Sequence, residues 1–235
     1  MDTKKYKTIG ILGGMGAAAS ADLYARIVRI AQTNYSAQQD SDFPEMWIYN
    51  LSLTDFDETG FVNKDSVLNQ LVAGVTKLSG TGSDFIVIPC NTVHFFYHEM
   101  QATISIPIVS IIDTVADAVV QAKHNTIGII SSKSTREMGL YEQAMSARGV
   151  SVVSVNDEEQ EHVDAIILRV IGGSQDQSDI NEMKRIAERL TSSGAQGVVL
   201  GCTELPLAIS QKDTRIPLFS STELLAEAAL RNAYS

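Results

Sequence analysis

The chain has 235 residues, of which 44% are apolar and 20% charged, a globular composition that excludes a disordered chain. Its formal net charge is −10 with no offsetting basic cluster, which argues against nucleic acid or an anionic membrane surface as a partner. No apolar stretch approaches the roughly 18 residues of a membrane span, and the N-terminal run is too broken by glycines for a signal peptide. We therefore expect a soluble cytoplasmic protein.

Apolar runs typical of buried strands alternate with amphipathic segments along the first half of the chain. The expected strands are residues 8–14, 45–53, 84–89 and 106–111, and the expected helices are residues 20–32 and 66–82. Because nearly all-apolar strands are buried on both faces, their alternation with helices predicts a parallel α/β sheet.

The second half of the chain repeats the first. TIGILGGMG at 8–16 returns as TIGIISSKS at 126–134, and SIPIVSIIDTVADAVV at 105–120 returns as RIPLFSSTELLAEAAL at 215–230. We infer two similar α/β lobes with parallel central sheets, related by pseudo-two-fold symmetry. The expected lobes are residues 1–113 and 114–235, with the C-terminal helix a candidate to pack back across the first lobe.

The only two cysteines of the chain fall at matching points of this repeat. Cys90 ends the apolar run DFIVIPC, and Cys202 ends QGVVLGC. Ligands of parallel α/β sheets bind at the carboxyl ends of the strands, so two facing lobes would bring both thiols to one ligand in the cleft between them. Buried structural cysteines are the alternative. Metal binding and dithiol redox chemistry lack their usual CxxC spacing.

Two chemically similar groups on opposite faces of a carbon suit the reversible inversion of a stereocentre. One group removes a proton, the other delivers one, and their protonation states are exchanged after each turnover. A thiol, with an ordinary pKa of about 8.5, can serve in either state near neutral pH.

Three motifs, IGILGGMG, IPCNTVH and VVLGCTE, together resemble those of the aspartate/glutamate racemase superfamily, and they are closest to its aspartate racemase branch. The resemblance covers essentially the whole chain. It implies cofactor-independent racemization of an amino acid, with Cys90 and Cys202 as the catalytic residues, and commonly a homodimer. Aspartate is the leading substrate, and glutamate or another amino acid is the alternative.

Removal of an α-proton without pyridoxal phosphate requires fixed donors for the charge that develops on the carboxylate. The resemblance assigns Asn91, Thr92 and Thr203 to the substrate, with helix N-capping as the alternative for both threonines. Glu204 would orient the substrate ammonium or tune Cys202, and an acid at a helix start is the other interpretation.

Two loops follow equivalent strands. Gly14 and Met15 would let backbone approach a ligand, unless the glycine serves only a tight turn. Ser132 and Thr135 match the spacing of a threonine pair in the family and are candidate carboxylate donors, with surface turn residues as the alternative. His94 and His98, which follow Cys90, we interpret as packing or surface histidines.

The sequence departs from the family where the substrate's side-chain carboxylate would be held. Residues 51–60 (LSLTDFDETG) lack the usual arginine, and residues 156–167 (NDEEQEHVDAII) lack the usual lysine. Lys133 is then the candidate for the missing positive charge, or else an exposed loop lysine.

A rival class remains. GMGAAA at 14–19 fits the dinucleotide pattern G-x-G-x-x-A after a strand and before a helix, although the acid expected at the end of the second strand is absent. The alternatives of another class are thus a nucleotide-binding protein and a non-catalytic amino-acid sensor.

Overall fold

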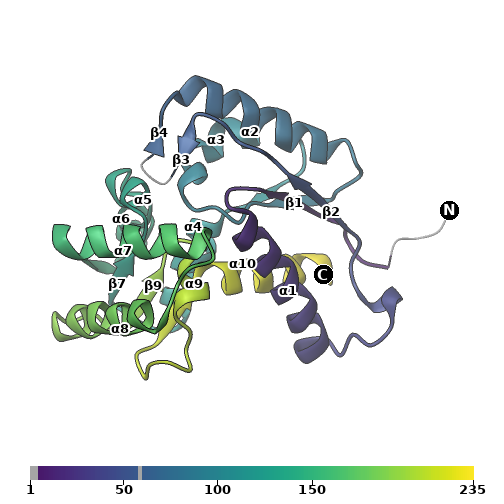
Figure 1. Cartoon of the computed structure of the whole chain (residues 1–235). Helices are drawn as coiled ribbons and strands as arrows, with labels where there is room; N and C mark the ends of the chain where they lie inside the picture. Colours follow the sequence, from purple (N-terminus) through teal and green to yellow (C-terminus); the bar gives the residue numbers. More distant parts are fainter. Residues whose placement is uncertain (1–4, 58–59) are drawn as a thin grey trace. The chain divides into compact units, whose positions relative to one another are not determined.

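The computed structural model describes residues 5–57 and 60–235 (Figure 1). Contacts divide the chain into two compact units, the first made of residues 5–57, 61–111 and 222–235 and the second of residues 60 and 112–221. The division lies at 111 and 112, where the sequence placed it after 113, and the last helix counts with the first unit. Within the described ranges, no helix is long and apolar enough to cross a membrane.

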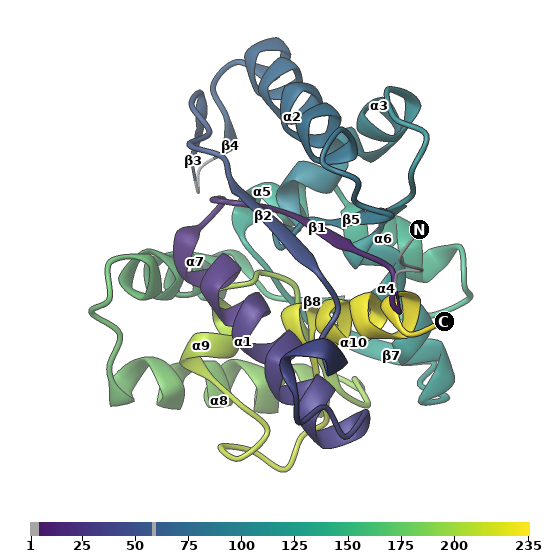
Figure 2. The ribbon, with the colours of Figure 1, turned by 90° about the vertical axis from the view of Figure 1, so that its right-hand side faces the viewer.

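The first unit is built on a parallel sheet of strand order β2-β1-β5-β6. Figures 1 and 2 show α2 and α3 on one face of this sheet and α1 and α10 on the other. Its elements are β1 (Ile9–Gly13), α1 (Ala17–Asn34), η1 (Asp40–Asp42), β2 (Met46–Asn50), β3 (Phe56–Asp57), β4 (Gly60–Phe61), α2 (Lys64–Ser79), β5 (Phe85–Val87), η2 (Thr92–Phe96), α3 (Tyr97–Ala102), β6 (Ile108–Val109) and α10 (Ser221–Ala233).

The expectation that every strand is buried on both faces is wrong for β2. Strands β1 and β5 are fully buried, but Trp47 and Ile48 of β2 are 45% and 49% exposed. Because β2 is the edge strand of its sheet, only one neighbouring strand covers it. An apolar run therefore predicts a strand here, but it does not predict how far the side chains of that strand are buried.

The second unit is built on a parallel sheet of strand order β10-β9-β7-β8. Helix α8 packs on β7 and β9, and the apolar faces of α7 and α8 form one core cluster with β9 and α9. Its elements are α4 (Ile111–Gln121), β7 (Thr126–Ile130), α5 (Lys133–Glu137), α6 (Leu140–Ser146), β8 (Ser151–Ser154), α7 (Asp157–Ile171), α8 (Gln177–Ser192), β9 (Val198–Leu200), α9 (Leu205–Ala208) and β10 (Leu218–Ser220).

The two sheets have the same topology, which confirms the expected pair of α/β lobes with parallel sheets. Read from its other edge, the second sheet runs β8-β7-β9-β10 and matches β2-β1-β5-β6 strand for strand. The register also matches, since Gly10 lies opposite Ile86 in the first sheet and Gly128 lies opposite Val198 in the second. Strands β5 and β9, which precede the two cysteines, therefore occupy equivalent positions.

Side-chain caps mark the start of three helices of the second unit, α5, α7 and α8. At the start of α7, Asn156 and Glu159 form a capping box, in which each side chain accepts a hydrogen bond from the other residue's backbone N–H. The buried Glu159 also pairs with the guanidinium of Arg189 on α8. Burial alone would raise the pKa of Glu159, but Arg189 and the Asn156 N–H outweigh it and hold the pKa below 4.5.

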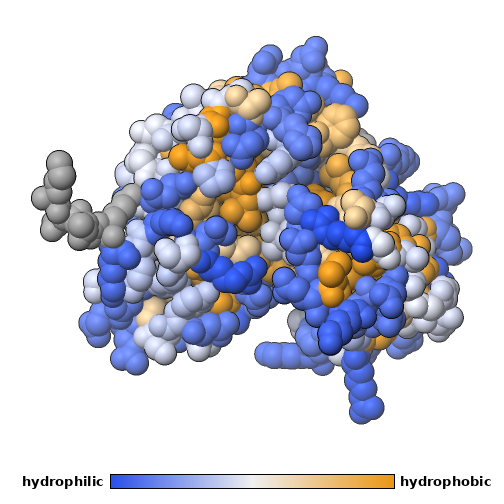
Figure 3. All heavy atoms as spheres, turned by 180° about the vertical axis from the view of Figure 1, so that it is seen from behind, coloured by the Kyte–Doolittle hydropathy of each residue, from blue (hydrophilic) through white to orange (hydrophobic). Residues whose placement is uncertain are grey.

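Polar and charged residues dominate the face of the molecule in Figure 3, and apolar residues gather there in smaller patches. This surface agrees with the composition, in which 20% of the residues are charged.

Candidate active site

The first thiol lies just beyond the carboxyl end of β5. Cys90 is a free cysteine with 6% of its surface exposed, and its backbone N–H donates to the Ile88 carbonyl at 2.9 Å. Asn91 and Thr92 follow as buried residues at the start of η2. Met15, from the loop after β1, belongs to the same apolar cluster as Cys90, so this unit brings two of the sequence-predicted residues into one cluster.

The turn after β1 requires glycine for a structural reason. Gly14 has a φ of +100°, and a Cβ there would lie 2.2 Å from the Leu51 carbonyl oxygen. The Gly14 N–H donates to Ser20 Oγ at 2.9 Å, and that hydroxyl donates to the Gly16 carbonyl at 2.8 Å. The tight-turn interpretation therefore holds for Gly14, and its role toward a substrate stays a prediction.

The second thiol is held by a carboxylate. Cys202, a free cysteine with 7% of its surface exposed, donates from Sγ to Glu204 Oε2 at 3.1 Å. Thr203 Oγ1 donates to the same oxygen at 3.1 Å. Glu204 is buried, and among the described residues no hydrogen-bond donor reaches its other oxygen, Oε1. This oxygen can accept a hydrogen bond from a ligand.

The helix-capping interpretations of the two threonines are wrong. The N-cap residues of η2 and α9 are Asn91 and Glu204, and neither makes a side-chain capping hydrogen bond. Thr92 and Thr203 are not the caps. The Glu204 carboxylate contacts the thiol and the Thr203 hydroxyl in place of the first N–H groups of α9.

The loop after β7 lies beside the loop that carries Cys202. Strand β7 pairs with β9, and the Gly201 N–H donates to the Ile130 carbonyl at 2.7 Å, so both strands end together. Ser132 and Thr135 are buried, which makes the surface-turn interpretation wrong for both. Ser132 caps α5, and its hydroxyl donates to Thr135 Oγ1 at 3.1 Å.

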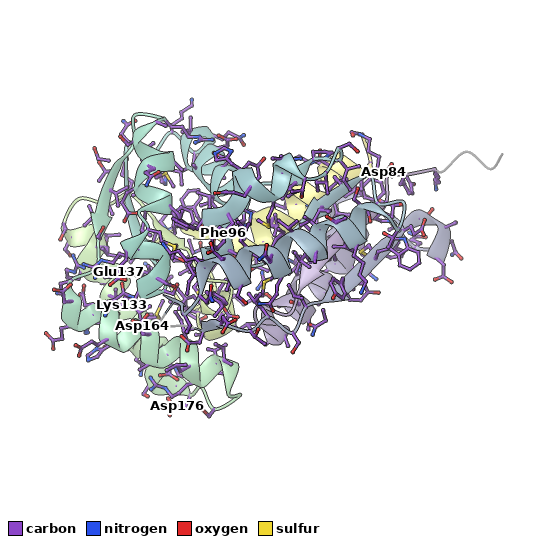
Figure 4. All side chains as sticks on the ribbon, turned by 90° about the horizontal axis from the view of Figure 1, so that it is seen from above. Asp84, Phe96, Lys133, Glu137, Asp164 and Asp176 are labelled. Atoms are coloured by element: carbon purple, nitrogen blue, oxygen red, sulfur yellow. The ribbon has the colours of Figure 1, made fainter. Side chains whose placement is uncertain are left out.

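Lys133, in contrast, is an exposed lysine among acids. Its side chain is 58% exposed, and its Nζ lies 3.9 Å from Glu137 Oε1. Its backbone N–H donates to Asp164 Oδ1 at 3.0 Å, and Figure 4 shows the three residues close together on α5 and α7. Burial raises the pKa of Asp164, although that N–H contact opposes the shift. The neighbourhood of this ammonium is therefore acidic.

Tyr141 packs beside the Cys202 loop, a position that the sequence did not predict. Its buried ring lies against Gly201, where a Cβ would be 2.6 Å from a ring carbon, and its hydroxyl bonds to Ser221. Burial and then the charge of nearby Cys202 raise the pKa of Tyr141 far above its usual range. No motif surrounds Tyr141 in the sequence, so only the tertiary packing shows that its ring contacts the Cys202 loop at Gly201.

His94 contacts backbone atoms through both of its ring nitrogens, which the sequence did not indicate. It is buried, its Nδ1 lies 2.8 Å from the Cys90 carbonyl oxygen, and its Nε2 accepts the Ile111 N–H at 3.2 Å. Over the described part of the chain, no group of three His, Cys, Asp or Glu side chains is arranged to hold a metal ion.

Comparisons with known proteins agree on one family. The profile of the family "Asp/Glu/Hydantoin racemase" matches residues 12–229. The broad specificity amino-acid racemase RacX of Bacillus subtilis is 26% identical over 222 residues, which cover 94% of this chain and 96% of that protein.

Solved structures agree with the profile. An aspartate racemase homologue from Pyrococcus horikoshii superimposes with a TM-score of 0.81 at 28% identity, covering 96% of this chain and 98% of that one. The aspartate racemase of Picrophilus torridus gives a TM-score of 0.83 at 25% identity, covering 96% and 93%. The chain therefore belongs to the Asp/Glu/hydantoin racemase family and is an amino-acid racemase.

Proposed function

We propose that Cys90 and Cys202 are the two acid–base groups that invert the α-carbon of the substrate. The observation that carries this proposal is their equivalence: each is a free, buried cysteine just past the carboxyl end of corresponding strands, β5 and β9. A reversible reaction between mirror-image substrates calls for two groups of the same chemistry, and a duplicated sheet supplies them.

In each turnover one cysteine, as thiolate, takes the α-proton, and the other, as thiol, delivers a proton to the opposite face. The first ends as thiol and the second as thiolate, so the enzyme is ready for the opposite enantiomer. Glu204 holds the Cys202 proton through its 3.1 Å hydrogen bond and favours proton transfer at that thiol. Its Oε1 is available to accept a hydrogen bond from the substrate ammonium.

The negative charge that develops on the substrate carboxylate needs donors fixed before the reaction. We assign this role to five polar residues of the cysteine and β7 loops, all of them buried: Asn91, Thr92, Ser132, Thr135 and Thr203. Burial supports the assignment, because a hydrogen bond to a developing charge is stronger where water is excluded.

The test is exchange of the α-proton in deuterated water, followed by loss of the α-proton NMR signal. Cys90→Ser and Cys202→Ser should each lower racemization by at least about 100-fold, the lower range of acid–base effects. Thr81→Ser, which keeps an exposed-loop hydroxyl in the first unit, is the matched control and should leave the rate unchanged. A cysteine variant with near wild-type turnover would contradict the two-thiol mechanism. EDTA and added pyridoxal phosphate should not change the rate.

Aspartate is the substrate we propose first, on the motifs, and Lys133 is the cation proposed for its second carboxylate. Loss of such a contact costs about 1.5–3 kcal/mol, or roughly ten- to a hundredfold in kcat/KM, so Lys133→Ala should lower aspartate turnover by that factor. Activity on uncharged amino acids should be spared.

One observation favours a second candidate substrate class. The Lys133 ammonium lies 3.9 Å from Glu137 Oε1, and its charge also acts to lower the pKa of Asp164, so both acids compete with a substrate carboxylate for it. A racemase of neutral or basic amino acids needs no cation there, and the similarity to RacX, a broad specificity enzyme, agrees with that. A preference of the wild type for alanine or lysine over aspartate, with no effect of Lys133→Ala, would select this candidate.

We also propose a homodimer in a reducing compartment, the cytoplasm. The exposed Trp47 and Ile48 on edge strand β2 support an association surface, and the chemistry requires that both thiols stay reduced. Light scattering should give about twice the 25.5 kDa chain mass, and a monomer would contradict the proposed homodimer.

A further inference from the structure

We propose that His94 is the positioning residue of the Cys90 thiol and that it works as a neutral imidazole with its proton on Nδ1. This inference rests on the proposed role of Cys90 but concerns a residue to which the sequence assigned no task. His94 lies four residues after Cys90, and its ring joins the Cys90 carbonyl to the first N–H of α4.

The two backbone partners determine the tautomer. The Ile111 backbone N–H can only donate, so the lone pair of His94 Nε2 must face it at 3.2 Å. A neutral imidazole then carries its proton on Nδ1, 2.8 Å from the Cys90 carbonyl oxygen, which can only accept. Either the other tautomer or the imidazolium would set two N–H groups against each other at Ile111.

The ring is also fixed in its plane. His94 is buried and stacks on the ring of Tyr97, with centroids 6.2 Å apart and an interplanar angle of 10°. The Tyr97 hydroxyl in turn donates to the Ile108 carbonyl at 3.2 Å. The ring therefore connects the Cys90 loop to the segment from β6 to Ile111 within the first unit, beyond Val87, where the pairing of β5 with β6 has ended.

The two thiols are thus held in different ways. A neutral ring holds the backbone of Cys90, whereas a carboxylate holds the sulfur of Cys202 directly. A change at His94 should consequently alter Cys90 alone, and a change at Glu204 should alter Cys202 alone.

Two amide variants separate the two bonds of the ring. In His94→Asn the amide nitrogen takes the place of Nδ1, which keeps the donor to Cys90 and loses the acceptor for Ile111. In His94→Gln the amide oxygen takes the place of Nε2, which keeps the acceptor for Ile111 and loses the donor to Cys90. His94→Ala removes both.

Iodoacetamide alkylates free thiols, and peptide mass spectrometry measures the alkylation rate at each cysteine. The two thiols are thus compared within one protein. We expect Cys90 to react about two- to tenfold faster in His94→Gln and His94→Ala than in the wild type, the factor for one hydrogen bond, and His94→Asn to stay near the wild type. Cys202 is the internal control and should react at the wild-type rate in all three. Faster reaction at both cysteines, or no change at Cys90, would overturn the proposal.

The tautomer is read directly from nitrogen-15 NMR of histidine-labelled wild-type protein, with the His94 signals assigned from His94→Asn. The Nδ1–H form at neutral pH is the expected result, and the Nε2–H form or the imidazolium would overturn the inference. This measurement does not depend on catalysis, so it stands even if the proposed function fails.

A catalytic readout uses the two enantiomers of 3-chloroalanine, whose elimination needs only one base. A thiolate takes the α-proton, the electron pair forms the double bond and expels chloride, and the 2-aminoacrylate is hydrolysed to pyruvate and ammonium. His94→Gln should slow elimination from the enantiomer that Cys90→Ser abolishes and spare the other. Equal slowing of elimination from both enantiomers would overturn a positioning role confined to Cys90. Failure of the wild type with either enantiomer would count against the proposed function, while alkylation and NMR still decide on His94.

Discussion

Replacing Gly201 with alanine should displace Cys202, because the ring of Tyr141 occupies the space that a side chain would need. The new Cβ would lie 2.6 Å from Cε2 and 3.1 Å from Cδ2 of the ring, and 3.2 Å from the Ser131 Cβ. Tyr141 is almost fully buried and its hydroxyl bonds to Ser221, so the ring cannot swing into solvent. The overlap is relieved by moving the end of β9 and the thiol that follows it.

The size of the effect follows from the overlap. Two carbon atoms normally meet at about 3.5–4.0 Å, so the Cβ intrudes by about 1 Å. Overpacking of this kind costs about 1–3 kcal/mol, which lowers the Tm of a chain of this size by about 3–10 °C. A thiol misplaced by a comparable distance loses about 10- to 100-fold in racemization rate.

Calorimetry and the decay of substrate optical rotation measure the two effects. Gly172→Ala is the matched control, since it lies in the same unit and its Cβ would meet nothing closer than the Leu168 carbonyl oxygen at 3.4 Å. We expect it to keep both Tm and rate. If Gly201→Ala also keeps the wild-type Tm and turnover, then Tyr141 does not set the position of the Cys202 loop.

Gly14→Ala should be more severe, at about 3 kcal/mol or more in urea unfolding, because it combines a positive φ with overlap against the Leu51 backbone; a smaller loss would contradict the turn geometry. Glu159→Gln should cost about 1–3 kcal/mol at pH 7 by removing the charged partner of Arg189. The pKa of Glu159 is lowered on folding, so its contribution is present above pH 4.5 and is lost as the pH falls through the lowered pKa. A Tm difference from the wild type that persists unchanged in acid would disprove this linkage.

The sequence alone was enough to predict the duplicated α/β fold and the equivalent places of Cys90 and Cys202. Strands appear as short apolar runs and helices as a period of about 3.6 residues; both patterns are local, and a repeat preserves them in both halves of the chain. Each cysteine comes directly after an apolar run that forms a parallel strand, β5 or β9. The sequence therefore indicated that both lie at the carboxyl edge of a sheet.

How far the side chains of each strand are buried could not be predicted from those patterns. Trp47 and Ile48 look like core residues in the sequence, yet they are exposed because strand order places β2 at an edge. Strand order depends on which elements pair across long stretches of chain, and no local period encodes it.

The environment of the reactive groups was likewise decided by tertiary packing. Glu204 points to the Cys202 sulfur instead of capping α9, and the ammonium of Lys133 lies near Glu137. The ring of Tyr141 reaches Gly201 from a helix in another part of the chain. Side-chain direction and distant neighbours arise only when helices pack on sheets, and for that reason the residue types were visible in the sequence while their partners were not.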